Sequence, residues 1–206
     1  MARSRSSSRW LQRHLNDPYV KQARKDGYRS RSAYKLIELN EKDRLFRPGM
    51  RVMDLGSAPG GWSQVAGRLV GEKGRVLATD ILPMDPLKNV DFIQGDFTDE
   101  AVAQQLLAWL QGHRFDLVIS DIAPNITGID SADQASSMYF LELALETVKL
   151  ALAPGATFVA KMFQGAGSDE YLRQLRSTFD KVLIRKPGAS RQASREVYIV
   201  AKGFRS

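Results

Sequence analysis

A glycine-rich turn is the first segment of this sequence whose residue types suggest chemistry. It reads Asp54-Leu55-Gly56-Ser57-Ala58-Pro59-Gly60-Gly61-Trp62. Glycines in such a turn let the backbone approach a ligand closely, because no Cβ stands in the way. A helix that starts after the turn would offer free N–H groups to an acceptor such as a carboxylate. The spacing of Gly56, Gly60 and Gly61 does not match the G-x-G-x-x-G of a nicotinamide-binding loop.

Three aspartates follow three successive apolar runs, and they are Asp80, Asp96 and Asp121. Asp80 could accept hydrogen bonds from both hydroxyls of a ribose, and Asp96 could accept from an adenine amino group. A dinucleotide-binding fold uses the first acid and has no regular need of the second. Asp121 suits a position near a cation, although alone it would be an ordinary turn residue ahead of Pro124. Together with the turn, these acids favour S-adenosylmethionine, a sulfonium cation, over a nicotinamide cofactor.

A lysine closes one of the apolar runs, in Phe158-Val159-Ala160-Lys161-Met162-Phe163. Lysine is rarely buried unless it is paired, so Lys161 is a candidate functional residue. The alternative is that its side chain extends along the protein surface into water. Lys35, in an early helical stretch, and Glu196, which opens the last apolar run, would each be read alone as solvated surface charges.

These residues must be positioned by strands and helices that alternate from Arg51 onward. The expected strands are 51–55, 75–79, 90–94, 115–120, 156–161, 181–185 and 196–202. The expected helices are 31–42, 61–70, 99–111, 134–152 and 168–178. Such alternation predicts an α/β, Rossmann-like fold with a mostly parallel seven-stranded sheet and helices on both faces. A loop without a helix joins the last two strands, so we expect the last strand to be antiparallel.

The charge of the chain is concentrated near its N-terminus. The net charge is +7; residues 1–35 hold ten Lys/Arg and two acids, a balance of +8, and the remainder holds 20 and 21, a balance of −1. This asymmetry favours a polyanionic partner. We expect a basic, RNA-facing arm over 1–30 and one domain over 31–206. The candidate RNA contacts are Arg9, Arg13, Lys21, Arg24, Lys25, Arg29, Arg31, Lys186, Arg191 and Arg195.

An organellar transit peptide is the alternative interpretation of the Arg/Ser-rich residues 1–9. Aromatic and aliphatic residues among the bases that follow, such as Trp10 and Tyr19, favour a folded arm. The sequence has no cysteine and two histidines, which excludes a disulfide framework, a zinc–thiolate site and a histidine cluster. No apolar run is long enough to span a bilayer. We therefore expect a cytoplasmic protein with no membrane contact and no metal.

The motifs together resemble the FtsJ family of RNA ribose 2′-O-methyltransferases, over about Ser6 to Lys202. The blocks that carry the resemblance are Ser8-Arg9-Trp10-Leu11, Arg29-Ser30-Arg31-Ser32-Ala33-Tyr34-Lys35-Leu36, the turn from Asp54 to Gln64, Ser120-Asp121-Ile122-Ala123-Pro124-Asn125, Lys161-Met162-Phe163-Gln164-Gly165 and Ser194-Arg195-Glu196-Val197-Tyr198. Ser57 stands where the family commonly has alanine, a change between two small residues.

The resemblance implies roles for particular residues. A K-D-K-E tetrad that surrounds the target ribose in the family carries over onto Lys35, Asp121, Lys161 and Glu196, with Lys161 as the proton acceptor. The implied contacts to S-adenosyl-L-methionine are Gly60, Trp62, Asp80, Asp96 and Asp121.

The resemblance also implies a substrate, a uridine ribose in the peptidyl-transferase A-loop of 23S rRNA within the assembled 50S ribosomal subunit. We expect the protein to work on it as a monomer. Two alternatives stay open, a transfer-RNA ribose 2′-O-methyltransferase and a non-catalytic RNA-binding module. The compact length of 206 residues favours the ribosomal substrate, and the intact tetrad disfavours the module.

Overall fold

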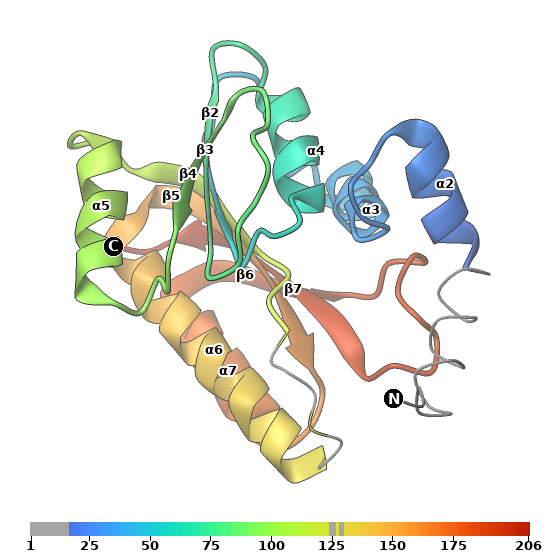
Figure 1. The fold of residues 1–206 in the computed structure, drawn as a ribbon. Helices are drawn as coiled ribbons and strands as arrows, with labels where there is room; N and C mark the ends of the chain where they lie inside the picture. The colour runs from blue at the N-terminus through green and yellow to red at the C-terminus, as the bar shows by residue number, and fades with distance from the viewer. Residues whose placement is uncertain (1–16, 124–126, 128–129) are drawn as a thin grey trace, which may run out of the picture.

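A single seven-stranded sheet forms the centre of the protein, in a computed structural model that describes residues 17–123, 127 and 130–206. The strand order is β3-β2-β1-β4-β5-β7-β6 (Figure 1). The strands are β1 Arg51–Leu55, β2 Arg75–Asp80, β3 Val90–Gln94, β4 Phe115–Ser120, β5 Leu152–Phe163, β6 Phe179–Arg185 and β7 Glu196–Phe204. Strands β1 to β5 run parallel to one another, whereas β7 runs antiparallel to both β5 and β6. The predicted fold class, including the reversed last strand, is confirmed.

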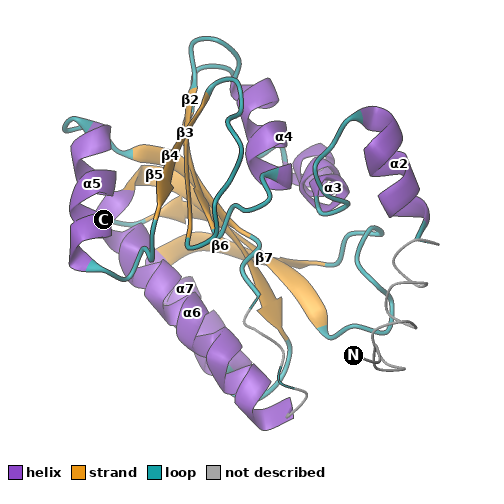
Figure 2. Cartoon of the chain, in the orientation of Figure 1, coloured by secondary structure: helices purple, strands orange, loops and turns teal. Residues whose placement is uncertain are grey.

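Helices cover both faces of this sheet (Figure 2). They are α2 Pro18–Asp26, α3 Ala33–Asp43, α4 Gly61–Val70, α5 Glu100–Leu110, α6 Asp130–Ala151 and α7 Ser168–Thr178. Helices α3 and α4 pack on one face through residues such as Leu36 and Val65, against Val52 and Ile119 of the sheet. Helices α5, α6 and α7 pack on the other face. Alternate residues along each strand therefore enter two separate cores.

Helix α2 was not predicted from the sequence. It begins at a recognisable signal, because the Asp17 side chain accepts a hydrogen bond from the Tyr19 backbone N–H and Pro18 occupies the first turn. Gly27, in the left-handed conformation at φ 72°, ends it. Two of its residues, Val20 and Ala23, are buried, so α2 packs on the domain next to α3.

Two other boundaries differ from the sequence prediction by four residues, and the rest by two or fewer. Helix α6 begins at Asp130, four residues earlier than expected, and β5 already starts at Leu152. The block Ser8-Arg9-Trp10-Leu11, Arg13, Pro124 and Asn125 lie outside the described residues. Among the helices that the structure describes, none is both long enough and apolar enough to cross a membrane.

Candidate active site

The register of two strands brings part of the predicted tetrad together. In the antiparallel pair of β5 and β7, Lys161 lies opposite Tyr198 and Phe163 lies opposite Glu196. Glu196 and Tyr198 are two residues apart on β7, so their side chains point to the same face of the sheet. Asp121 follows the end of β4, the other neighbour of β5. Helix α3 packs on this face and carries Lys35.

The four predicted residues form one hydrogen-bonded network. Lys35 Nζ donates to Glu196 Oε1 at 2.7 Å and to the Tyr198 hydroxyl at 2.9 Å. The Tyr198 hydroxyl donates to Asp121 Oδ1 at 2.7 Å. Lys161 Nζ donates to the backbone oxygen of Asp121 at 2.7 Å and lies 3.1 Å from Asp121 Oδ1. A buried lysine with fixed partners is thus held beside a carboxylate, since Lys161 is only 8% exposed.

Burial and charge set the protonation of two members of this network. Burial by itself would raise the pKa of Glu196, but the Lys35 charge and hydrogen bond and the Ser190 hydroxyl outweigh it and hold the pKa below its usual value. Burial, together with the negative charges of Asp121 and Glu196, raises the pKa of Tyr198 well above its usual value. Glu196 is therefore a carboxylate paired with Lys35, and Tyr198 keeps its proton and remains a donor.

A cavity of about 570 Å³ opens at the carboxyl ends of the parallel strands, where open α/β sheets bind their ligands. Its lining residues are Gly56, Ala58, Asp80, Ile81, Leu82, Gly95, Asp96, Phe97, Asp121, Ile122, Ala123, Ser136 and Phe140. The described residues that line it include three carboxylates and no lysine or arginine. A cationic ligand suits such a cavity, whereas the pyrophosphate of a dinucleotide would be repelled by the carboxylates.

The glycine-rich turn shapes one wall of this cavity. Gly56 has φ 71°, and a Cβ added there would lie 2.1 Å from Ile122 Cγ1, so only glycine fits. Asp80 fixes the turn from the neighbouring strand, because its two carboxylate oxygens accept from the backbone N–H groups of Ala58 at 2.8 Å and Leu82 at 2.9 Å. Asp96 is fixed in a similar way, since its Oδ1 accepts from the N–H and the hydroxyl of Thr98.

Two of the predicted cofactor contacts do not line the cavity with their side chains. Gly60 precedes α4 at φ 103°. The Trp62 indole faces the core at 2% exposure, where its Nε1 donates to the Ser32 backbone oxygen at 2.8 Å and its ring lies 5.6 Å from that of Tyr198. These two residues can reach a ligand in the cavity only through their backbone.

The comparisons with known proteins agree with this geometry. The sequence model of the family described as FtsJ-like methyltransferase matches residues 28–204. The chain belongs to this family. It is 69% identical over 205 residues to the ribosomal RNA large subunit methyltransferase E of Stutzerimonas stutzeri, covering 100% of both chains. It is 64% identical to the protein of that name from Marinobacter nauticus, covering 100% of this chain and 99% of the other.

A solved structure shares the same methyltransferase fold. It is a crystal structure from Plasmodium falciparum described as a ribosomal RNA methyltransferase, with a TM-score of 0.78 and 32% sequence identity. The match covers 86% of this chain and 98% of the other. In the described part of this FtsJ-like methyltransferase, no group of three or more acidic or histidine side chains is arranged to hold a metal ion.

Tyr198 belongs to this hydrogen-bonded network, although we assigned it no role from the sequence. Its hydroxyl connects the Lys35–Glu196 pair to Asp121 and so completes the network. The signal was present, because β7 was predicted and a strand places residues i and i+2 on one face. Because Glu196 was a candidate, Tyr198 could have been placed on the same face of the sheet from the sequence.

Asp54, near the end of β1, should make the free energy of unfolding depend on pH. Burial raises its pKa from the ordinary 3.8 to about 7; the Ser63 hydroxyl, at 2.6 Å from Oδ2, opposes the shift, and the charges of Asp121 and Asp80 add to it. Between these two pH values the unfolded chain loses the proton while the folded protein keeps it. The free energy of unfolding therefore falls as the pH rises from about 4 to about 7, and the loss persists above that.

We expect Asp54→Asn to remove this loss, because the amide is neutral at every pH. Relative to the parent protein, the variant should gain about 2 kcal/mol in free energy of unfolding between pH 5 and pH 8. Urea unfolding at both pH values measures the difference. Asp99→Asn, at an exposed residue that makes no capping hydrogen bond, is the matched control. A constant difference between Asp54→Asn and the parent would contradict the prediction.

Proposed function

We propose that this protein transfers a methyl group from S-adenosyl-L-methionine to the 2′-hydroxyl of a uridine in 23S rRNA. The observation that carries the proposal is the position of Asp121. Its side chain lines the acidic cavity, and both its carboxylate and its backbone oxygen hold Lys161. A cofactor site and a buried amine therefore meet at one residue. The names of the similar proteins, ribosomal RNA large subunit methyltransferase E, support an rRNA substrate.

The cavity fits the cofactor in size and charge. Its volume of about 570 Å³ lies within the usual range for small-molecule sites. Asp80 would accept from the ribose hydroxyls, Asp96 from the adenine amino group, and Asp121 would face the sulfonium. The backbone of Gly60 and Trp62, at the start of α4, would meet the carboxylate of the methionine moiety, because the N–H groups of a first helical turn favour an anion.

S-adenosylmethionine, when bound, supplies the methyl group on a positively charged sulfur. The residues of the chain must hold the 2′-oxygen in line with it, and such positioning contributes roughly 7–11 kcal/mol. Lys161 would accept the proton that the 2′-hydroxyl loses as the methyl group leaves the sulfur and bonds to the 2′-oxygen. Lys35 and Glu196 neutralise each other and hold the ribose, while Asp121 keeps Lys161 in place. The site thus combines orientation with general base catalysis.

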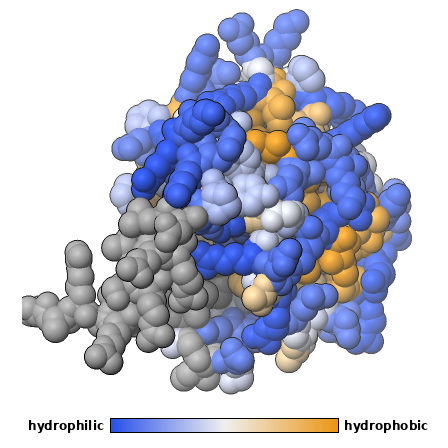
Figure 3. All heavy atoms as spheres, turned by 90° about the vertical axis from the view of Figure 1, so that its right-hand side faces the viewer, coloured by the Kyte–Doolittle hydropathy of each residue, from blue (hydrophilic) through white to orange (hydrophobic). Residues whose placement is uncertain are grey.

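The RNA would lie over the face that carries α2, α3 and the loop before β7. Figure 3 shows this side of the molecule, where most of the visible described surface is hydrophilic. The predicted RNA contacts that are exposed are Lys21, Arg24, Lys25, Lys186, Arg191 and Arg195. Phosphate contacts become weaker as the salt concentration rises, and they do not distinguish one nucleotide sequence from another. Selectivity for the A-loop would therefore come from the shape of the assembled 50S subunit. We also propose that the protein acts as a monomer in the cytoplasm.

Four of the predicted RNA contacts also have partners within the protein, and Lys186 and Arg195 are two of them. Arg31 donates to the Asp17 carboxylate and to the Ala189 backbone oxygen. The Arg29 guanidinium donates to three backbone oxygens, those of Pro59 at 3.2 Å, Asp85 at 2.7 Å and Pro86 at 2.9 Å. Arg29 therefore ties the glycine-rich turn to the loop that follows β2, and both of these segments contribute to the cavity wall.

We expect Arg29→Ala to weaken cofactor binding about tenfold. Hydrogen bonds from a charged group are each worth about 1.5–3 kcal/mol, and part of that loss should reach the cofactor through the loosened wall. Isothermal titration with S-adenosylmethionine measures the dissociation constant. Arg24→Ala, on the exposed side of α2, is the control and should bind the cofactor like the parent. Equal dissociation constants for both variants would show that Arg29 does not support the site.

The substrate is tested with three RNAs assayed side by side. Labelled S-adenosylmethionine is offered with large ribosomal subunits that lack the modification, with naked 23S rRNA and with transfer RNA, and the methylated nucleotide is mapped. We expect label on a uridine 2′-oxygen of the A-loop in the subunits. Label in transfer RNA alone would favour that alternative. Cofactor binding without label in any RNA would favour the non-catalytic module.

A further inference from the structure

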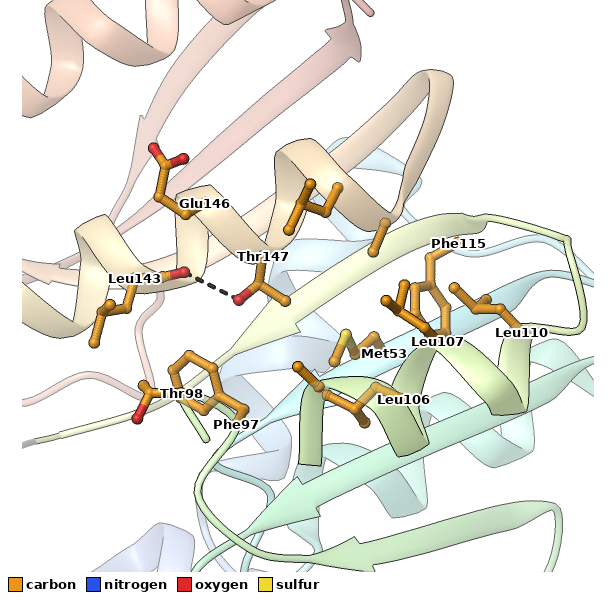
Figure 4. A pocket seen from close by; sticks show the side chains of 13 residues that line it. Met53, Phe97, Thr98, Leu106, Leu107, Leu110, Phe115, Leu143, Glu146 and Thr147 are labelled. Carbon is orange, nitrogen blue, oxygen red and sulfur yellow. Dashed lines mark hydrogen bonds between the residues drawn. The ribbon is translucent and has the colours of Figure 1, made fainter. Parts of the chain in front are cut away.

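A second cavity, of about 210 Å³, lies between α5 and α6 on the face of the sheet opposite α4. Figure 4 shows its lining from close by. Met53 of β1 and Phe115 of β4, both fully buried, contribute from the sheet. Leu106 and Leu110 of α5 and Leu143 of α6 contribute from the helices. None of these residues belongs to the tetrad or to the proposed cofactor contacts.

The polar groups around this cavity already have partners. The Thr147 hydroxyl donates to the Leu143 backbone oxygen at 3.0 Å, and the Thr98 hydroxyl donates to Asp96 Oδ1 at 2.7 Å. Glu146 has a side chain that is 67% exposed and pairs with Lys149, so it lies at the rim. A water molecule would find few hydrogen-bond partners inside, and apolar cavities of about 150 Å³ are known to stay dry and to hold benzene.

The wall of this cavity is shared with the cofactor cavity. Phe97 lines both of them, and it stands directly between Asp96 and Thr98, which are hydrogen-bonded to each other. Met53, in the wall of the second cavity, precedes Asp54 at the end of β1. A molecule in the second cavity would therefore contact Phe97 and restrict the movement of the adjacent Asp96.

We propose that this cavity binds one small uncharged aromatic molecule, and that its binding strengthens cofactor binding through Phe97. The volume suits one or two fused rings, and Glu146 at the rim disfavours an anion. Leu107 and Leu150, which also line the cavity, are 51% and 72% exposed and lie at its solvent-facing side. The coupling to the cofactor rests on the proposed function, whereas the binding itself does not.

Indole is a suitable probe, because it is compact, aromatic and uncharged. Isothermal titration of the full chain should show one molecule bound, and indole-3-acetate, with the same ring and a carboxylate, should bind at least tenfold more weakly. Ala103→Leu adds a side chain inside the cavity and should weaken indole binding tenfold or more. Ala108→Leu makes the same change at an exposed position of α5 and should leave it unchanged. If Ala103→Leu does not fold, Ala103→Val makes a smaller addition.

Titration of indole in the presence of saturating S-adenosylmethionine distinguishes binding in one cavity from binding in the other. Indole should still bind with the cofactor present, and indole should lower the dissociation constant of the cofactor two- to fivefold. Coupling is reciprocal, so the cofactor should tighten indole binding by the same factor. If the protein bound indole but not the cofactor, the proposed function would fail and the cavity assignment would stand.

Four results would overturn the proposal or its coupling to the cofactor. Displacement of indole by the cofactor would place the probe in the cofactor cavity. Unchanged indole binding in Ala103→Leu would place it elsewhere. If no neutral probe bound while Ala103→Leu lost affinity for large ribosomal subunits, the cavity would instead receive an apolar side chain of a protein partner. An unchanged cofactor dissociation constant at saturating indole would overturn the coupling.

Discussion

Lys161→Met is expected to slow methyl transfer about a thousandfold, while the dissociation constant of S-adenosylmethionine changes less than threefold. The methionine side chain fills the space of the buried lysine but can neither orient the 2′-oxygen nor accept its proton. General base catalysis alone contributes about 10²- to 10⁴-fold. The cofactor should still bind, because Lys161 does not line the large cavity in which Asp80 and Asp96 lie.

The measurement is single-turnover transfer of labelled methyl to large ribosomal subunits, across pH, for Lys161→Met and Lys161→Ala. Lys149→Met is the matched control, since Lys149 lies exposed on α6 and pairs with Glu146. It should transfer methyl at the parent rate. Near-normal rates in both Lys161 variants would remove the lysine from the mechanism, and the carboxylate of Asp121 would then be the next candidate for the base.

The sequence predicted the fold well because the periodicity of its strands and helices is strong. The central strands β1, β2 and β4 are short apolar runs that are buried along most of their length, and helices follow β1 and β4 in the chain. The missed helix α2 is short and polar on average, and only Val20 and Ala23 of it are buried. Its cap, formed by Asp17 and Pro18 at one end and Gly27 at the other, was the only local signal.

Side-chain directions were harder to predict than strand positions. The resemblance named Trp62 as a cofactor contact, but the start of α4 turns its indole toward Ser32 and the core. Arg29 was interpreted as an RNA contact because it lies in a basic segment. Its three acceptors are backbone oxygens up to 57 residues away along the chain, and no local pattern reveals such partners. The charge of an arginine indicates that it needs hydrogen-bond acceptors. It does not indicate which acceptors the folded chain provides.

The four residues of the tetrad are joined into one network by a fifth residue, Tyr198. Lys35 and Glu196 form one pair, and Lys161 and Asp121 form another. The Tyr198 hydroxyl is the shortest connection between them, because it accepts from Lys35 and donates to Asp121. Since Asp121 also lines the large cavity, this one hydroxyl connects the Lys35–Glu196 pair to the residues that we propose hold the cofactor.

Tyr198→Phe is therefore expected to lower kcat about 10- to 100-fold, with little change in KM. The change deletes only the hydroxyl and leaves the buried ring against Trp62. Asp121 then loses a donor and Lys35 loses an acceptor, and a hydrogen bond to a charged group is worth about 1.5–3 kcal/mol. Steady-state methyl transfer to large ribosomal subunits measures both constants, and thermal unfolding measures stability.

Tyr171→Phe is the matched control for this loss of a buried hydroxyl. The Tyr171 hydroxyl donates to the Leu141 backbone oxygen at 2.9 Å, in the core on the opposite face of the sheet. Both variants should lose stability, but only Tyr198→Phe should lose kcat. An equal fall in kcat would mean that destabilisation explains the effect. An unchanged kcat in Tyr198→Phe would mean that the ion pairs hold the tetrad without the tyrosine, because each pair is already fixed by its own direct contact.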